Sequence, residues 1–224
     1  TGNRMEHTNV KILAISDVPS KALWDYDTRA RLEGIDLILS CGDLPKKYLE
    51  YITNFTAAPI LYVHGNHDTA YLQHAPEGCV DIDGRVYEYK GLRIAGLGGC
   101  MKYNDSPFMY TEAQMQKRIN KLKPSLWISK GVDILVTHAP AEGYGDLDDL
   151  PHTGYACFNE LLDKYKPAYM VHGHVHQEYG QFQRELIHES GTKIVNGYQK
   201  TIIEVEPSEH TEKSFLYPYF VTKF

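Results

Sequence analysis

The stretch Ile12–Ser20, ILAISDVPS, decides the first element of the fold. The residues from Ile12 to Ile15 are apolar, and the chain then runs through Asp17 to Pro19. A short apolar run of this kind is typical of a buried β-strand, and a proline soon afterwards indicates that the strand has ended. We therefore expect the carboxylate of Asp17 to lie at the mouth of a strand, where a sheet meets solvent.

Apolar runs alternate with helix-compatible segments from this point on. The segments Val10–Ile15, Asp36–Ser40 and Pro59–Val63 predict short buried strands, and between them lie the helix-compatible segments Lys21–Glu33 and Lys46–Phe55. This alternation is typical of a parallel sheet that is covered by helices. The first part of the chain is therefore predicted to have an α/β fold.

The pattern changes after residue 78. Two alternating runs with glycine between them predict a hairpin over Cys79–Gly99. The later predicted elements are a polar helix over Thr111–Lys123 ended by Pro124, a strand over Val132–Thr137, an amphipathic helix over Tyr155–Tyr165, a strand over Ala168–Val171, and short β runs from Glu185 on. Because no repeat or linker interrupts the chain, one domain over residues 1–224 with two sheets is the simplest description.

Composition narrows the class of protein. A chain of 224 residues that is 42% hydrophobic can bury a sizeable core. Its net charge of -6 gives no broad electrostatic basis for binding nucleic acid or an anionic membrane. The N-terminal residues lack the apolar core of a signal peptide, and the four cysteines form no C-x-x-C pair. We therefore expect free thiols and a cytoplasmic location.

Each predicted strand ends in a polar phrase. These phrases supply Asp17, Gly42-Asp43, His64-Gly65-Asn66-His67-Asp68, Thr137-His138 and His172-Gly173-His174-Val175-His176. Ligands of open α/β sheets bind outside the carboxyl ends of the strands, so parallel strands would bring these side chains together. Carboxylates, an amide oxygen and imidazoles suit divalent Mn, Fe or Zn.

Taken singly, these motifs also have ordinary structural explanations. A histidine at a strand end is usually hydrogen-bonded, and the phrase GNHD alone is compatible with a turn. The ordered set of five phrases is what favours metal chemistry. The remaining histidines divide into four that we expect at the surface and two that the pattern leaves undecided: His7, His74, His188 and His210, and His152 and His172.

The order of these motifs resembles that of the calcineurin-like metallophosphoesterases over about residues 10–205. The resemblance implies a four-layer α/β/β/α sandwich of two mixed β-sheets flanked by helices. The phrases THAPAEGYGDLDD and HGHVHQEYG are most similar to the small phosphodiesterase-type members. The Ser/Thr protein phosphatase branch normally has an arginine soon after the second-motif aspartate, and GDLPKKY lacks it.

The resemblance also implies roles for the site residues. Two divalent ions, with manganese favoured, would be bridged by Asp43. The other ligands would be Asn66, His138 and His174 for one ion, and Asp17 and His176 for the second. His67 would lie near the leaving-group oxygen, with Asp68 orienting it.

One position departs from the family pattern. The first motif of the family is Asp-x-His, whereas this chain has Asp17-Val18-Pro19. Proline has no ligating side chain, so the second ion is expected to bind weakly. A substitute ligand from Asp25 or Asp27 is an alternative to an ordinary solvated helix face.

Hydrolysis of a small phosphodiester or phosphomonoester by a metal-bound hydroxide is the leading hypothesis, with a diester favoured. The rival is a catalytically weakened metal-binding interaction scaffold of the same fold, which Pro19 makes possible. The retained Asn66, His67 and His138 argue against the scaffold. A nuclease fits the motifs, but no basic stripe supports a long polyanionic substrate. The sequence does not specify the natural substrate or the oligomeric state.

Overall fold

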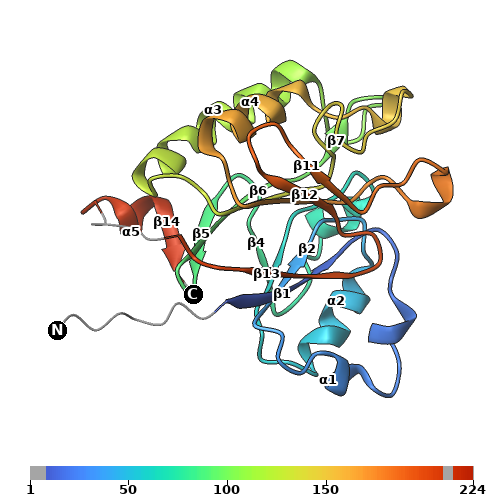
Figure 1. The fold of residues 1–224 in the computed structure, drawn as a ribbon. Coiled ribbons are helices and arrows are strands. Elements are labelled where there is room, and N and C mark those ends of the chain that lie inside the picture. The colour runs from blue at the N-terminus through green and yellow to red at the C-terminus, as the bar shows by residue number, and fades with distance from the viewer. Residues whose placement is uncertain (1–8, 209–213, 224) are drawn as a thin grey trace.

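Two large β-sheets stack face to face, and helices cover both outer faces (Figure 1). The computed structural model describes residues 9–208 and 214–223, so the expectations for His7 and His210 lie outside the described residues. Helices α3 and α4 lie on one side of the sandwich, and α1 and α2 lie on the other (Figure 1). The predicted four-layer α/β/β/α architecture is confirmed. Within the described residues, no helix has the length and apolar character needed to cross a membrane.

The first sheet contains all three strands that were predicted near the N-terminus. Its strand order is β13-β1-β2-β3-β4, in which β1 to β4 are parallel and β13 is antiparallel to β1. The strands are β1 (Val10–Ile15), β2 (Leu37–Ser40), β3 (Ile60–Tyr62), β4 (Cys79–Asp81) and β13 (Thr201–Val205).

The second sheet has the order β11-β12-β10-β9-β6-β5-β14. Its strands are β5 (Val86–Tyr89), β6 (Leu92–Leu97), β9 (Ile134–Thr137), β10 (Tyr169–His172), β11 (Glu185–Ile187), β12 (Lys193–Asn196) and β14 (Val221–Lys223). A small separate pair is formed by β7 (Cys100–Met101) and β8 (Met109–Tyr110). Strands β6, β9, β10 and β12 are parallel neighbours, so β9 and β10 end at the same edge.

The hairpin predicted over Cys79–Gly99 is correct only for its second part. Strands β5 and β6 pair in antiparallel fashion, and their turn at Lys90 and Gly91 has positive φ at both residues, as two-residue hairpin turns require. The first run, β4, instead pairs with β3 in the other sheet. Ile82 then packs between the two sheets as the chain crosses from one to the other.

The helices differ from the prediction at two places. They are α1 (Thr28–Arg31), α2 (Lys46–Thr53), α3 (Glu112–Ile128), α4 (Ala156–Tyr165) and α5 (Tyr217–Phe220), with the short 3-10 helices η1 (Lys21–Leu23), η2 (Asp68–Leu72), η3 (Leu150–His152) and η4 (Gln177–Tyr179). The single helix expected over Lys21–Glu33 is wrong, because only η1 and α1 form there. Trp24 lies between them, with its ring 5.2 Å from that of Tyr48 on α2, and this packing interrupts the helix.

Pro124 does not end α3, which continues to Ile128. A proline inside a helix removes one backbone hydrogen bond, yet Leu126 and Ile128 beyond it are buried in the core. Their burial outweighs the lost bond. Thr111 begins the helix with a reciprocal capping box to Gln114.

Alternation of side chains along the strands divides the core into three apolar layers. On β1, Ile12 and Ala14 face the layer between the two sheets, whereas Leu13 and Ile15 face α2. On β9, Ile134 and Val136 share the layer between the sheets. Leu135 and its neighbours face α3 and α4 instead. Because successive residues of a strand point to opposite faces, strands buried on both faces must be continuously apolar, as the sequence shows.

Leu39 tests the layer between the sheets. Its side chain is fully buried in that layer, so Leu39→Ala should lower the free energy of unfolding by about 2–5 kcal/mol. Urea unfolding followed by circular dichroism measures this loss. Ile202→Ala is the matched control, because Ile202 lies on β13 with 51% of its surface exposed, and its cost should be about 1 kcal/mol or less. Equal costs for the two variants would contradict the layer assignment.

Candidate metal centre

The polar residues that follow the strands of both sheets meet at one cavity of about 270 Å³. Its lining residues are Asp17, Asp43, Asn66, His67, Tyr103, Pro151, His152, His174, His176 and Tyr179. Six of the eight sequence-predicted site residues are in this set. The other two, His138 and Asp68, are buried beside the cavity and contact its lining residues.

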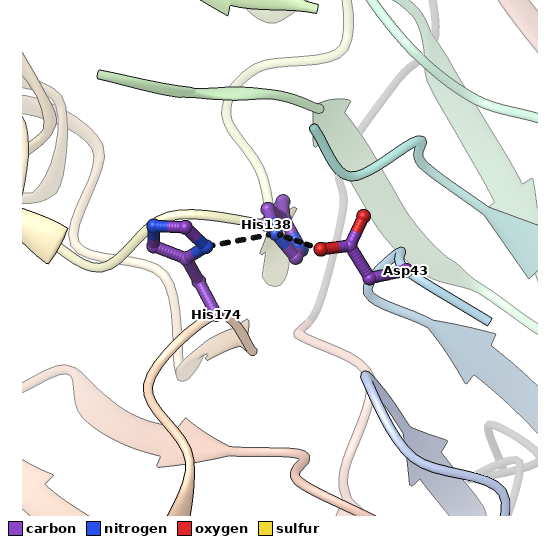
Figure 2. A group of neighbouring side chains, drawn as sticks. All are labelled: Asp43, His138 and His174. Carbon is purple, nitrogen blue, oxygen red and sulfur yellow. Dashed lines mark hydrogen bonds and ion pairs between the residues drawn. The ribbon is translucent and has the colours of Figure 1, made fainter. Parts of the chain in front are cut away.

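The imidazole of His138 is the centre of this cluster (Figure 2). Its Nε2 atom lies 3.2 Å from Oδ2 of Asp43, 3.0 Å from Oδ1 of Asn66 and 3.1 Å from Nδ1 of His174. Ligand atoms of Asp43, His138 and His174 all lie within 4.8 Å of one another. Two imidazole nitrogens, a carboxylate oxygen and an amide oxygen facing one point are a donor set that suits a divalent transition metal.

The outer atoms of these ligands are held by neighbouring groups. Nδ1 of His138 donates to the carbonyl oxygen of Cys41 at 2.7 Å, and Nε2 of His174 donates to that of Pro151 at 2.7 Å. Each bond leaves the inner ring nitrogen for a metal, which is the usual arrangement of ligating histidines. Nδ2 of Asn66 donates to the hydroxyl of Tyr103 at 3.3 Å, so the amide oxygen points toward His138.

Asp17 and His176 form a second cluster next to the first. Nε2 of His176 lies 3.3 Å from Oδ1 of Asp17, and the His176 ring stacks on that of Tyr179 at 5.0 Å. The carboxylate of Asp17 also accepts the backbone N–H of His174 at 3.1 and 3.0 Å. Burial alone would raise the pKa of Asp17, but the hydrogen bond from His176 and the charge of His138 hold it below its ordinary value.

Pro19 faces a different pocket, of about 390 Å³, together with Lys21, Trp24 and Asp25. Asp25 accepts the backbone N–H of Tyr26 at 2.7 Å. Among the described residues that line the candidate metal cavity, neither Asp25 nor Asp27 occurs. The geometry therefore does not support the alternative in which one of them replaces the missing histidine.

The backbone at the site is held in an uncommon conformation. Asp17, Asp43 and His174 have φ values of 65°, 57° and 69°, in the left-handed region that few non-glycine residues adopt. The chain also approaches closely here, since a Cβ atom on Gly65 would clash with the carboxylate of Asp43, and one on Gly173 with that of Asp17. Such strain is typical of functional sites.

Asp68 supports Asp43 and not the ring of His67. Its Oδ2 atom accepts the backbone N–H groups of Asp43 at 2.8 Å and of Gly65 at 2.7 Å. Burial and then the charge of Asp43 raise the pKa of Asp68 to about 7. Across the residues that the structure describes, no hydrogen bond joins Asp68 to the imidazole of His67, so the expected orienting contact is not seen. His67 is exposed, and its backbone N–H donates to Oδ1 of Asp43 at 2.8 Å.

Sequence reasoning missed four lining residues and misplaced one histidine. Tyr103 lies outside the helices and strands, Pro151 belongs to η3, and Tyr179 belongs to η4 within the phrase HGHVHQEYG. None of the three was named as a candidate, and His152 was left undecided. His188 is buried beside Tyr144 and not at the surface, whereas His74 is exposed as predicted. His172, also undecided, is buried and donates from Nδ1 to the carbonyl of Gly173 at 2.9 Å. Burial lowers the pKa of His172 to about 4.

The pKa values of the cluster predict how metal binding depends on pH. Burial alone would lower the pKa of His138, but the adjacent Asp43 outweighs burial and raises it to about 9. Burial lowers the pKa of His174 to about 3, so this ring is already neutral. At pH 7 an incoming ion must therefore displace a proton from His138. In the metal-free protein, protonated His138 and the carboxylate of Asp43 stabilise the folded state. This stabilisation is complete below the ordinary histidine pKa of 6.5 and is lost as the pH rises through the raised pKa of about 9.

Calorimetric titration with manganese in buffers of different ionisation enthalpy should show about one proton released per ion at pH 7. Affinity should rise with pH and level off above about 9. In the control His138→Asn, both the proton release and most of the affinity should disappear. Affinity that stays constant between about pH 6 and 9 in the parent protein would contradict the assigned role of His138.

Known proteins are similar to this chain in sequence. The chain is 24% identical to the human lariat debranching enzyme, over 74% of this chain and 42% of that enzyme. It is also 24% identical to UPF0046 protein K07C11.7 of Caenorhabditis elegans, over 77% of this chain and 67% of the relative. The chain thus spans less than half of the human relative's length.

Solved structures share the fold. TT1561 of Thermus thermophilus superposes with a TM-score of 0.60 at 16% identity, over 90% of this chain and 100% of that one. A structure described as a novel phosphatase from Mycoplasma pneumoniae gives a TM-score of 0.51 at 16% identity, over 86% and 73%. The calcineurin-like phosphoesterase family matches residues 10–178, which include every residue of the metal cavity except Tyr179. The chain belongs to the calcineurin-like phosphoesterase family.

Proposed function

We propose that this chain is a metal-dependent phosphoric ester hydrolase that prefers a small phosphodiester to a monoester. The observation that carries the proposal is the meeting of Asp43, Asn66, His138 and His174 at one point beside an open cavity. An interaction scaffold has no need of such a donor set. Two names among the compared proteins, a debranching enzyme and a phosphatase, are names of enzymes and also support catalysis.

The residues fit two ions that share Asp43. Asn66, His138 and His174 would complete the ligands of one ion, and Asp17 and His176 would hold the other. The mixture of oxygen and nitrogen donors favours manganese, iron or zinc. Bound divalent ions would supply activated water and would neutralise charge on the phosphoryl group.

The chain's own residues would position the substrate and move a proton. His67 is exposed at the cavity, and its backbone is fixed to the carboxylate of Asp43. An imidazole at this edge can donate a proton to a departing alkoxide. Asp68 keeps the Asp43 and Gly65 backbones together, so it maintains the distance between His67 and the metal ligands.

A metal-binding interaction scaffold without catalytic activity is the alternative function. It follows from Pro19, which stands where the family has a ligating histidine, so the second ion would have only Asp17, Asp43 and His176 as protein ligands. Three protein ligands can still hold a catalytic ion. Metal analysis of the purified protein, combined with hydrolysis assays on bis(p-nitrophenyl) phosphate and p-nitrophenyl phosphate with added manganese, separates the two functions. Hydrolysis supports the enzyme, whereas bound metal without hydrolysis supports the scaffold.

Asp43→Asn should remove most of the bound metal and lower hydrolysis by at least about a hundredfold, since Asp43 would contact both ions. Metal content is measured by elemental analysis and folding by circular dichroism. Asp105→Asn is the matched control, because Asp105 is almost fully exposed beside Lys102 and its loss should change neither quantity. Normal turnover by a folded, metal-depleted Asp43→Asn variant would contradict the proposal.

His67→Ala should retain the metal and lose activity in proportion to how much the leaving group needs a proton. For an alkyl ester the loss in kcat should be about 10²–10⁴-fold. For p-nitrophenyl esters, whose leaving group hardly needs protonation, it should be much smaller. The exposed His74 provides the control His74→Ala, which should behave like the parent. The acid role is wrong if good and poor leaving groups suffer the same loss.

A further inference from the structure

His152 is an imidazole at the metal cavity to which the proposed chemistry assigns no role. It is the last residue of η3, in the segment between β9 and α4. It lines the cavity together with Asp17, Asp43 and His67, and its side chain is 19% exposed. The ring is therefore accessible to a molecule that enters the cavity.

Asp149 holds this ring in one orientation. Nδ1 of His152 lies 2.8 and 2.9 Å from the two carboxylate oxygens of Asp149. The same carboxylate accepts the backbone N–H of His152 at 3.1 Å, and the hydroxyl of Thr153 donates to the Asp149 carbonyl at 2.9 Å. Because Nδ1 faces Asp149, Nε2 is the ring nitrogen that is left to face a molecule in the cavity.

The segment that carries His152 is attached to the metal ligands. The carbonyl of Pro151 accepts the hydrogen bond from Nε2 of His174 at 2.7 Å. The His152 ring lies between two others, 5.0 Å from the ring of His174 and 4.8 Å from that of Tyr179. His152 thus reaches the cavity from the side of His174, whereas His67 reaches it from the side of Asp43.

The acidic lining of the cavity suggests what the imidazole of His152 could bind. Asp17 and Asp43 are acidic, and no lysine or arginine is found among the described lining residues. A phosphoester is anionic, so phosphoryl oxygens turned away from the metal ligands need a donor from the protein. The hydroxyl of Tyr103 accepts from Asn66 and keeps its own hydrogen to donate, so it is one such donor, and the imidazole of His152 is another. An imidazole nitrogen that carries hydrogen can donate to an oxygen. Asp149 is the acceptor next to Nδ1 of His152, and a bound phosphoryl oxygen would be the acceptor for Nε2.

We propose that His152 binds a non-bridging oxygen of the substrate's phosphoryl group and that Asp149 positions its ring. The inference rests on the proposed function, since it concerns the same cavity. It adds a substrate-binding residue that lies outside the motifs at the strand ends. Ester oxygens would then be held between His152 and His67.

The test measures inorganic phosphate binding to the manganese-loaded protein by calorimetry, together with kcat and KM on bis(p-nitrophenyl) phosphate. His152→Gln should weaken phosphate binding about tenfold or more, the scale of a lost hydrogen bond to a charged group. Manganese affinity should stay within about twofold of the parent, because the metal ligands are untouched. The nitrogen NMR signal of His152 Nε2 should shift when phosphate is added to the zinc-loaded parent.

Two further variants separate positioning from folding. Asp149→Asn keeps an acceptor for Nδ1 and should retain most of the phosphate affinity, whereas Asp149→Ala should lose as much as His152→Gln. His74→Gln is the control for an exposed histidine and should bind phosphate like the parent. Thermal unfolding of each variant shows whether it is folded.

The results distinguish the two hypotheses. Unchanged phosphate binding in His152→Gln overturns the inference, even if the parent protein hydrolyses esters normally. A manganese affinity that falls as much as the phosphate affinity also overturns it, because His152 would then act on the metal. Absence of hydrolysis by the manganese-loaded parent counts against the proposed function, while the phosphate comparison still decides the role of His152.

Discussion

The contact of His138 with the first sheet is the interaction on which the site depends. His138 follows β9 in the second sheet, yet its ring bonds the carbonyl of Cys41 and the carboxylate of Asp43, which follow β2 in the first sheet. A second hydrogen bond also runs from the second sheet to the first: the backbone N–H of His174, which follows β10, donates to the carboxylate of Asp17, which follows β1. These bonds cross the sandwich at the edge where the parallel strands of both sheets end. Candidate ligands that lie far apart in sequence therefore face one another without long loops.

The apolar layer between the sheets makes this arrangement rigid. Buried side chains such as Leu39 and Val136 pack against one another in it, so sliding of one sheet over the other would open voids. The uncommon backbone conformations of Asp17, Asp43 and His174 persist because the surrounding core fixes them. An ion that binds these ligands only in the folded state would add to the stability of the whole domain. The same rigid edge supports η3, which brings His152 to the cavity from outside the strand ends.

Much of the fold and of the candidate site could be predicted from the sequence. Strands buried on both faces consist of consecutive apolar residues, and here each is followed by a polar phrase. The bounds of β1 were predicted to the residue, and the meeting of the strand-end phrases at one place followed from the parallel topology. The grouping of Asn66, His138 and His174 with Asp43 came from the family resemblance, and Asp43, His138 and His174 do lie together. Errors arose where tertiary packing overrides local pattern. Trp24 packs on α2 and divides an expected helix, and α3 passes Pro124 because residues beyond it are buried. In the part of the chain that the structure describes, Asp68 accepts from backbone N–H groups and not from the His67 imidazole, and Asp149 lies beside Nδ1 of His152. Neither contact can be read from the spacing of residues in the sequence.

The account is tested most directly by a crystal structure of the manganese-loaded protein, with anomalous scattering recorded at the manganese edge. It predicts one strong peak within about 2.0–2.3 Å of His138 Nε2, His174 Nδ1 and oxygens of Asp43 and Asn66. A second, weaker peak should lie about 3.5–4 Å away, between Asp17, Asp43 and His176. No peak beside His138, or manganese bound only elsewhere on the protein, would contradict the claim that the strand ends of the two sheets build a metal centre.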